Sequence, residues 1–324
     1  KSIDQTIEIL KIPEGYKVGI VAGSDTGAIE MAMWNLLGSK PVEILAWEVF
    51  GNDWKKDILE QLKINDSNTH VADFGDIPDL SKINFDNDVI FTWNGTTSGV
   101  KVPNADWIPL DRKGLVLCDA TSAVFAQDVE WKKLDVVTFS WQKVLGGEAA
   151  HGIIVLSPKA IEHLESYTPK WPIPKIFRLT KSNKVIEGIF KGETLNTPSM
   201  LCVEDYLDAL SWVKGIGGLS ACFGRANDSF NLINDWVDRS DAIDFLCQEK
   251  INRSNTSVCL KFCDDRVVSQ NDETQRALAK EIGVLLEKEG VAYDIVNHRS
   301  APPGLRIWTG ATVESTDVKA LLPW

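Results

Sequence analysis

Short apolar segments alternate with helical or loop segments across the first two-thirds of the chain, and this alternation restricts the possible folds more than any other feature. Strand-like stretches rich in Val, Ile and Leu occupy residues 16–23, 42–48, 69–75, 86–95, 114–122, 135–143 and 151–157. Helical periodicity follows the first two of them, over residues 24–38 and 51–63. Continuous apolar strands of this kind predict an α/β fold with a mostly parallel sheet sandwiched by helices.

The last third of the chain has a different pattern. Two long helical stretches run from residue 200 to 237, and a strand at 257–262 and a helix at 274–290 follow. Two further strands are predicted at 291–296 and 304–310. We therefore expect a large domain over residues 1–216 and a smaller C-terminal α+β domain over residues 217–324.

Charge and cysteine content exclude several classes of protein. The 324 residues include 46 acidic and 34 basic ones, a net charge of −12 that disfavours binding to nucleic-acid phosphates. The apolar runs are too short to cross a membrane, so no membrane partner is expected. Six scattered cysteines, without C-x-x-C or zinc-like Cys/His spacing, predict reduced thiols in a cytoplasmic protein with no metal site.

Small polar clusters stand where the predicted strands end: GSDTG at 23–27, NGTTSG at 94–99, DATS at 119–122 and SWQK at 140–143. In parallel α/β sheets, ligands bind beyond the carboxyl ends of the strands. These clusters are therefore expected to share one rim of the sheet and to form the site.

Lys143 permits three interpretations. With Ser140 it matches the S-x-x-K pair of penicillin-recognising hydrolases, and alone at a strand end it fits a lysine that forms a Schiff base with a carbonyl cofactor. The third interpretation is a solvated lysine in a turn. The hydrolase interpretation fails, because Ser140 ends a strand and the chain contains neither S-D-N nor K-T-G.

Two further strand ends carry carboxyl groups. Asp119 ends the apolar stretch GLVLCD, where it is either a helix cap or the partner of a buried cation, such as the ring nitrogen of pyridoxal phosphate. Asp25 lies in the turn GSDTGA, whose backbone N–H groups at a helix start suit a phosphate. The triplet D-T-G occurs once and precedes a helical segment, so an aspartic protease is excluded.

Basic side chains gather in the C-terminal stretch NHRSAPPGLRIWTG. His298, Arg299 and Arg306 lie within nine residues of an otherwise acidic chain. The guanidinium fork binds carboxylates and phosphates with two hydrogen bonds, so the cluster suits an anionic substrate. Surface arginines on a loop and a strand are the alternative.

Four ordered stretches, CDATSA, TFSWQKVLGGEAAHG, FKGETLNTPSM and PPGLRIWTGAT, closely resemble the phosphoserine aminotransferases. The similarity covers essentially the whole chain and points to the branch of alphaproteobacteria and some archaea, within the class V, fold-type I enzymes that use pyridoxal 5'-phosphate. It implies a homodimer with shared active sites. It also implies transfer of an amino group between glutamate/2-oxoglutarate and 3-phosphohydroxypyruvate/phosphoserine, in serine biosynthesis.

The resemblance also implies roles for individual residues. Lys143 is similar to the lysine that binds the cofactor, and Asp119 to the aspartate that pairs with its ring nitrogen. Arg306 resembles the arginine for the substrate α-carboxylate, and His298 and Arg299 the pair for the substrate phosphate. The other cofactor-binding positions it implies are Asp25, Thr26, Phe50, Thr96, Thr121 and Gln142, with Asn196 and Thr197 donated by the second subunit.

Two features depart from the family pattern. The aromatic residue stacked on the cofactor ring aligns with Phe50, and Trp47 is a rival. The family's opening segment, with an S-G-P element and a His-Arg pair, has no match here, so part of the substrate site is expected in residues absent from this sequence. The alternatives are an aminotransferase for an unphosphorylated substrate, of alanine–glyoxylate or serine–pyruvate type, and a non-catalytic binding protein of the same fold.

Overall fold

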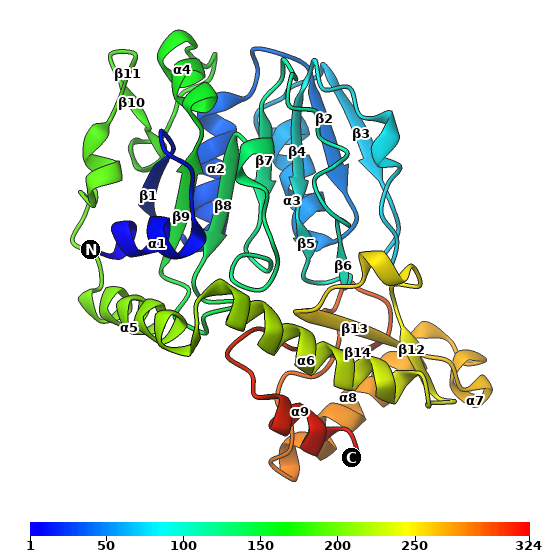
Figure 1. Cartoon of the computed structure of the whole chain (residues 1–324). Helices are drawn as coiled ribbons and strands as arrows, with labels where there is room; N and C mark the ends of the chain where they lie inside the picture. The colour runs from blue at the N-terminus through cyan, green and yellow to red at the C-terminus, as the bar shows by residue number, and fades with distance from the viewer.

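The computed structural model describes all 324 residues and contains two main sheets with the helices that cover them (Figure 1). The larger sheet has seven strands in the order β1-β9-β8-β7-β4-β2-β3. Their bounds are β1 (Lys17–Ala22), β2 (Val42–Ala46), β3 (Ser67–Val71), β4 (Asp88–Thr92), β7 (Val116–Asp119), β8 (Val136–Ser140) and β9 (His151–Leu156).

Five neighbouring strands of this sheet, from β8 to β3, run parallel to one another. Strand β9 lies between β8 and β1 and is antiparallel to both. The prediction of a mostly parallel α/β sheet is therefore confirmed. Because β4, β7 and β8 are parallel, their carboxyl ends lie along the same edge.

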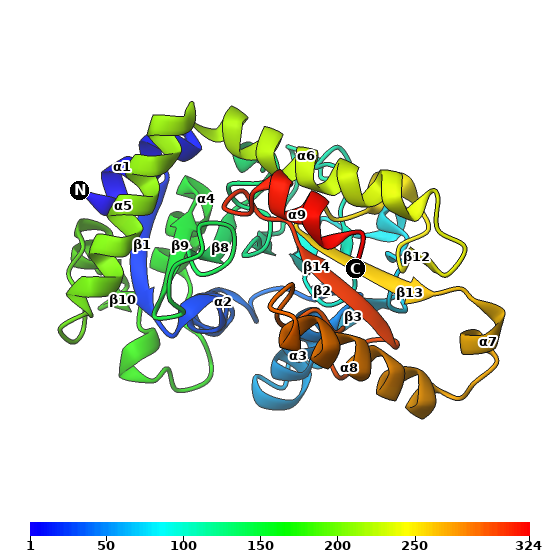
Figure 2. The same ribbon diagram turned by 90° about the horizontal axis from the view of Figure 1, so that it is seen from below.

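Helices cover both faces of the sheet. Helices α2 (Ser24–Leu36), α3 (Val49–Lys56) and α4 (Pro158–Ser166) pack on one face. Helices α1 (Ser2–Leu10) and α5 (Met200–Ile216) lie on the other, as Figure 2 shows. Two small hairpins, β5 (Asn94–Gly95) with β6 (Val100–Lys101) and β10 (Thr180–Lys181) with β11 (Lys184–Val185), complete this part of the chain.

The turn between β1 and α2 depends on glycine. Gly23 has a φ of 86°, a conformation that favours glycine, and it directly precedes the helix. A side chain at Gly27 would collide with the carbonyl oxygen of Ala22, so only glycine allows the first turn of α2 to fold back on the end of β1. The helix start is thereby held at the rim of the sheet, beside the ends of β8 and β7.

The C-terminal part is built on a three-stranded antiparallel sheet of β12 (Ile243–Phe245), β13 (Ser257–Phe262) and β14 (Gly304–Trp308). Around it lie α6 (Leu219–Val237), α7 (Asp265–Val268), α8 (Asp272–Lys288) and α9 (Ser315–Leu321). The expected boundary after residue 216 falls at two glycines between α5 and α6. The first half of α6 packs into the core of the large sheet and its second half into the C-terminal core.

Several local predictions differ from the structure. Residues 291–296 form no strand; only Val296 makes an isolated bridge, to Leu305. Tyr293 and Asp294 are exposed there, and Asp294 has a φ of 50°, so the segment turns instead of extending. Helices α1 and α4 and strand β12 were not predicted, because their short patterns are ambiguous without the neighbouring core.

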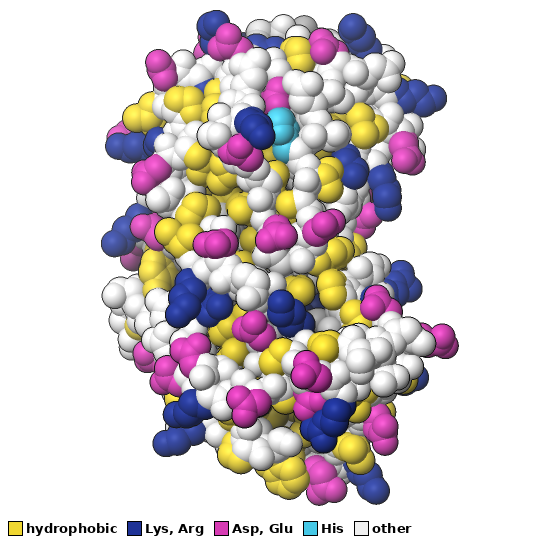
Figure 3. Space-filling model, turned by 90° about the vertical axis from the view of Figure 1, so that its right-hand side faces the viewer, with side chains coloured by type: hydrophobic (Ala, Val, Ile, Leu, Met, Phe, Trp, Pro, Cys, Tyr) yellow, Lys and Arg dark blue, Asp and Glu magenta, His cyan; other side chains and the backbone are white.

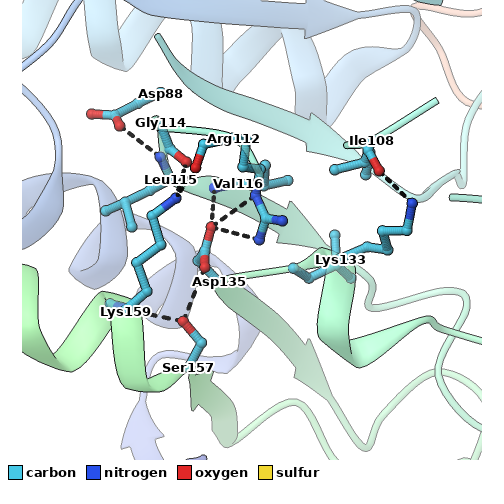
Figure 4. A network of polar contacts seen from close by, with 12 residues as sticks. Asp88, Ile108, Arg112, Gly114, Leu115, Val116, Lys133, Asp135, Ser157 and Lys159 are labelled. Carbon is cyan, nitrogen blue, oxygen red and sulfur yellow. Dashed lines mark hydrogen bonds and ion pairs between the residues drawn. The ribbon is translucent and has the colours of Figure 1, made fainter. Parts of the chain in front are cut away.

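A buried ion pair ties the strand ends opposite to the site (Figure 4). Asp135, just before β8, accepts hydrogen bonds from Arg112 at 2.9 and 3.2 Å, from the backbone N–H of Val116 at 2.9 Å and from Ser157 at 3.1 Å. Both charged side chains are only 4% exposed. One carboxylate thus links the start of β7, the start of β8 and the end of β9.

All six cysteines are free, and five of them are buried, which agrees with the prediction of reduced thiols. None of the helices combines the length and the apolar character that crossing a membrane requires.

Candidate active site

The polar clusters at the strand ends converge between the two sheets. Thr96, Gln142, Lys143 and Arg306 line one cavity of about 560 Å³, to which both parts of the chain contribute. Figure 3 shows the surface indented, on the right of the view, between the upper part built on the large sheet and the lower part built on the small one. Two of the four strand-end clusters, NGTTSG and SWQK, thus reach the same cavity.

Lys143 follows β8 and is partly buried at the cavity wall. Burial and the nearby positive charge of Arg306 lower the pKa of Lys143, while Asp119 and Glu48 oppose that shift. A larger share of the side chain is therefore the neutral amine, the form that acts as a nucleophile or base. Ser140 donates its hydroxyl to the carbonyl oxygen of His151 at 3.0 Å, so the structure gives it no role as a nucleophile.

The segment that carries Lys143 is fixed by an aromatic stack. Trp141 is buried and lies against Tyr206 of α5, with ring centroids 4.3 Å apart and planes 17° apart. Tyr206 in turn shares a 2.7 Å hydrogen bond with Thr6 of α1. Burial raises the pKa of Tyr206 well above its ordinary value, so it stays neutral. Sequence reasoning missed this support, because partners about 65 and 135 residues from Trp141 leave no local pattern.

Asp119 ends β7 and is 5% exposed. Its Oδ1 accepts from the backbone N–H of Thr121 at 3.1 Å, and its Oδ2 accepts from the indole N–H of Trp54 at 3.2 Å. These two donors fix the plane of the carboxylate. Trp54 was not predicted as a site residue; its place on the buried side of α3 was the available signal.

Asp25 and Thr26 occupy the start of α2, as predicted, but their side chains point to different places. Thr26 is exposed, whereas the Asp25 side chain is buried beside Asp119. Burial and the adjacent Asp119 raise the pKa of Asp25 well above its ordinary value. The neighbouring Ser24 donates to Gln142 at 2.7 Å, which joins the helix start to the Lys143 segment.

Two threonines predicted to contact the cofactor lie on adjacent turns. The hydroxyl of Thr96 is hydrogen-bonded to that of Ser122, and Thr96 also lines the cavity. The hydroxyl of Thr121 is buried and has no hydrogen-bond partner within the chain. A buried hydroxyl without a partner is costly, so Thr121 is suited to a ligand atom.

Glu48 is a further buried carboxyl group beneath the site. It accepts from the backbone N–H of Gly51 at 2.7 Å, which caps α3, and from Thr97 at 2.8 Å. Burial raises its pKa to about 7. Sequence reasoning missed Glu48, although a glutamate directly after a strand and before a helix was the available signal.

The two candidates for the stacking aromatic differ in burial. Trp47 is 1% exposed, and its indole N–H donates to the carbonyl oxygen of Val100 at 3.1 Å, inside the core. Phe50 is partly buried and lines a neighbouring cavity of about 370 Å³ together with Thr26 and Trp54. Stacking of Phe50 on the cofactor ring stays a prediction. Trp47 is the weaker candidate, because its side chain is enclosed in the core.

The three predicted substrate-binding residues lie on the C-terminal part. Arg306, on β14, pairs with Asp294 at 3.1 Å and is 20% exposed. His298 is partly buried, and burial together with the charges of Arg306 and Arg299 lowers its pKa. Arg299 is exposed. Both arginines are close enough to His298 to lower its pKa, so the cluster is positive.

Asn196 and Thr197 are exposed and do not line the cavity with Lys143. They border a separate cavity of about 810 Å³ beside β1. Within one chain the structure therefore does not bring them to the other predicted site residues. No group of three or more His, Cys, Asp or Glu side chains in the chain is arranged to hold a metal ion.

Pyridoxal 5'-phosphate fits this constellation. A lysine amine, an opposing buried carboxylate and a helix start with small residues supply the attachment point, the ring-nitrogen partner and the phosphate cradle. The buried hydroxyl of Thr121, two residues after Asp119, has no hydrogen-bond partner within the chain and is available to such a ligand. The residues present therefore agree with the cofactor that the sequence resemblance implies.

Comparisons with known proteins agree with this cofactor assignment and show the family. The chain is 53% identical to the phosphoserine aminotransferase of Methanosarcina barkeri over 324 residues, which covers all of this chain and 85% of that protein. The corresponding protein of Methanosarcina mazei is 52% identical with the same coverage. No family model matches the chain.

Solved structures share the fold. A phosphoserine aminotransferase from Cytophaga hutchinsonii superimposes with a TM-score of 0.78 at 20% identity and covers 99% of this chain and 85% of that one. The phosphoserine aminotransferase from Bacillus circulans subsp. alkalophilus has a TM-score of 0.78 at 19% identity, covering 99% and 83%. An alanine–glyoxylate aminotransferase from Nostoc sp. has a TM-score of 0.76 at 16% identity, covering 99% and 85%.

Proposed function

Because the chain belongs to the phosphoserine aminotransferase family, we propose that it is the aminotransferase that forms phosphoserine for serine biosynthesis. It exchanges the amino group between L-glutamate/2-oxoglutarate and 3-phosphohydroxypyruvate/O-phospho-L-serine, with pyridoxal 5'-phosphate as cofactor. The observation that carries the proposal is the cavity that Lys143 and Arg306 line together, with the buried Asp119 close enough to act on the pKa of the lysine. A reactive amine and an anion-binding arginine thus share one space.

Bound pyridoxal phosphate supplies an electron-withdrawing ring, which lets a proton leave and return at the substrate α-carbon. Lys143 is the residue that moves this proton, since its lowered pKa increases the share of the neutral amine that can act as a base. Its partly buried position limits access of water to that amine. Gln142, held by Ser24, fixes the backbone next to it.

Asp119 holds the opposite end of the cofactor. Its carboxylate, oriented by Trp54 and the Thr121 N–H, would accept a hydrogen bond from the ring nitrogen of the bound cofactor and keep the proton there. Burial makes this charge interaction stronger than it would be in water. Asp119 is therefore the group that maintains the ring in its electron-withdrawing form.

Arg306 binds the α-carboxylate of the substrate, and His298 with Arg299 binds its phosphate. The supporting observation is the positive field of the cluster, in which both arginines lower the pKa of the histidine between them. An incoming phosphate dianion reverses this effect and favours the protonated imidazole. An unphosphorylated substrate would still bring a carboxylate to Arg306 but no anion to His298 and Arg299.

We further propose a homodimer in which Asn196 and Thr197 reach the cofactor phosphate of the second subunit. Both are exposed and distant from their own Lys143 cavity, and the nearby Leu195, Met200 and Leu201 are 50%, 59% and 67% exposed. Apolar side chains gathered at a surface in this way are typical of an interface. Six free cysteines support a cytoplasmic location.

The test is Lys143→Ala, assayed for transfer from glutamate to 3-phosphohydroxypyruvate. We expect turnover to be lost while far-UV circular dichroism stays unchanged. Lys132→Ala, an exposed lysine near the start of β8, is the matched control and keeps its rate. Retained turnover in Lys143→Ala would contradict the assignment. Turnover by the unmodified protein with glyoxylate or pyruvate instead of phosphohydroxypyruvate would favour an aminotransferase for unphosphorylated substrates.

A further inference from the structure

Asp25 has a buried carboxyl group with no partner of its own. It lies in the first turn of α2, its side chain is 5% exposed, and its Oδ1 has no hydrogen-bond donor within the chain. The hydroxyls of Thr121 and Thr138 lie beside it, and both are also buried without a hydrogen bond of ordinary geometry. The carboxyl group of Asp119 is also within hydrogen-bonding reach of the Asp25 carboxyl.

Two ionised carboxylates cannot be neighbours in a buried site without strong repulsion, so one of them holds a proton. The hydrogen-bond donors around each carboxyl group determine which of the two is protonated. Asp119 accepts two N–H groups, from Trp54 and from the Thr121 backbone, and both stabilise a negative charge. Asp25 accepts from no N–H group, and the neutral hydroxyls of Thr121 and Thr138 beside it favour its charge less than burial and Asp119 oppose it, so the proton belongs on Asp25.

The start of α2 opposes this assignment, because the partial positive charge of a helix N-terminus favours an anion. That effect is modest, whereas burial and the adjacent Asp119 both disfavour a second charge. Other titratable groups also face the pair. Cys118 on β7 and Glu48 before α3 add no positive charge, and Lys143 after β8 is the nearest cation. Asp119 is among the charges that act on the pKa of Lys143, and Asp25 is not.

We propose that Asp25 is a positioning residue for Asp119: it keeps its carboxyl proton and donates it in a hydrogen bond to the Asp119 carboxylate. The charge then stays on Asp119, which faces the ring nitrogen, and the carboxylate is held from a third side. The role of Asp119 in this statement rests on the proposed function, but the location of the proton does not.

The first test uses the cofactor-free protein. A carboxyl group whose pKa is raised by folding stabilises the folded state at low pH and loses that contribution as the pH rises through the folded pKa. We therefore expect Asp25→Asn, which keeps an N–H donor, to raise the urea midpoint above that of the unmodified protein at pH 8. The increase should be smaller at pH 5.5.

Asp272→Asn is the matched control, since Asp272 is an exposed aspartate in the first turn of α8. Loss of the Asp272 charge should lower the urea midpoint slightly at both pH values, because an ionised carboxylate at a helix start is stabilising. A fall in the Asp25→Asn midpoint at pH 8 that equals or exceeds the fall in this control would show an ionised Asp25 and overturn the proposal.

A second measurement uses the unmodified protein, so it does not depend on whether an Asp25 variant folds. Infrared spectra of the cofactor-free protein with and without ¹³C-labelled aspartate at pH 8 should contain an isotope-shifted carbonyl band of a protonated aspartic acid. The label separates Asp25 from Glu48, and Asp88, whose pKa burial raises to about 6, is largely ionised at that pH. Absence of the shifted band would refute the proposal.

The third test reports positioning in the loaded enzyme. Asp25→Ala leaves Asp119 without its third donor and should lower kcat about tenfold more than Asp25→Asn does, with little effect on the KM for phosphoserine. Equal losses in the two variants would contradict a donor role. If the protein bound no pyridoxal phosphate, the proposed function would fail, whereas the urea and infrared results would still decide where the proton lies.

Discussion

Trp54→Phe is the change that tests most directly how the Asp119 carboxylate is held. Phe keeps the aromatic bulk on α3 but lacks the indole N–H that donates to Asp119. Without that donor, Oδ2 of Asp119 loses its N–H partner. The carboxylate is then freer to rotate away from the ring nitrogen.

The size of the effect follows from the geometry. A hydrogen bond to a charged group contributes about 1.5–3 kcal/mol. The donor–acceptor distance of 3.2 Å is at the long end for N–H···O, so the lower figure applies. About 1.5 kcal/mol of lost transition-state stabilisation corresponds to roughly a tenfold lower kcat.

The assay is steady-state transfer from glutamate to 3-phosphohydroxypyruvate, with Trp171→Phe as the control. Trp171 also loses an indole hydrogen bond, at 2.8 Å to the carbonyl oxygen of Trp34, but near the C-terminal end of α2 and away from Lys143. We expect the control to lose stability without losing kcat. A kcat for Trp54→Phe within twofold of the unmodified enzyme, or an equal loss in the control, would refute the reasoning.

Three further predictions concern other parts of the molecule. Arg112→Ala leaves the buried carboxylate of Asp135 without its cation and should lower the free energy of unfolding by about 3–5 kcal/mol in urea denaturation. Asp294→Asn releases Arg306 from an exposed ion pair and should lower the KM for phosphoserine by less than about fivefold. Because the pKa of His298 is lowered in the free protein, binding of phosphoserine at pH 8 should take up a proton, and affinity should weaken as the pH rises further. Calorimetry in buffers of different ionisation enthalpy measures that uptake.

Each of these has a control within the chain or among the ligands. Lys113→Ala breaks an exposed pair with Asp86 and should change stability by less than about 1 kcal/mol. Asp317→Asn removes another carboxylate from the same cavity, so it should leave the KM near its original value. L-serine, which has no phosphate, should bind without the proton uptake. A rise in KM for Asp294→Asn, or no proton uptake with phosphoserine, would contradict the geometry.

Much of the fold could be predicted from local patterns. Strands such as β2 and β8 are continuous apolar runs, and α2 has a helical period that starts after a glycine. Residues 291–296 also have an apolar pattern, yet they turn at Asp294 beside the cavity. The sequence alone does not distinguish a short strand from a loop that lines a site.

The site could be predicted where a residue type itself carries the chemistry. Lys143 and Asp119 stand out because a lysine or carboxylate at the end of a buried strand is costly without a ligand or partner, and Arg306 stands out because it forms a basic cluster with His298 and Arg299 in an acidic chain. Trp54 and Tyr206 do not stand out, since each is an ordinary apolar residue of a helix until the fold brings it against its partner. Support of this kind depends on contacts between residues distant in the chain.

The most direct test of the central claim is the visible absorption spectrum of the purified protein, before and after addition of L-phosphoserine. We predict a yellow band from pyridoxal phosphate bound to Lys143, which phosphoserine bleaches and which serine and alanine do not. A yellow band that phosphoserine leaves unchanged would contradict the substrate assignment. A protein that stays colourless with added pyridoxal phosphate would contradict the assignment of Lys143 and Asp119 to this cofactor.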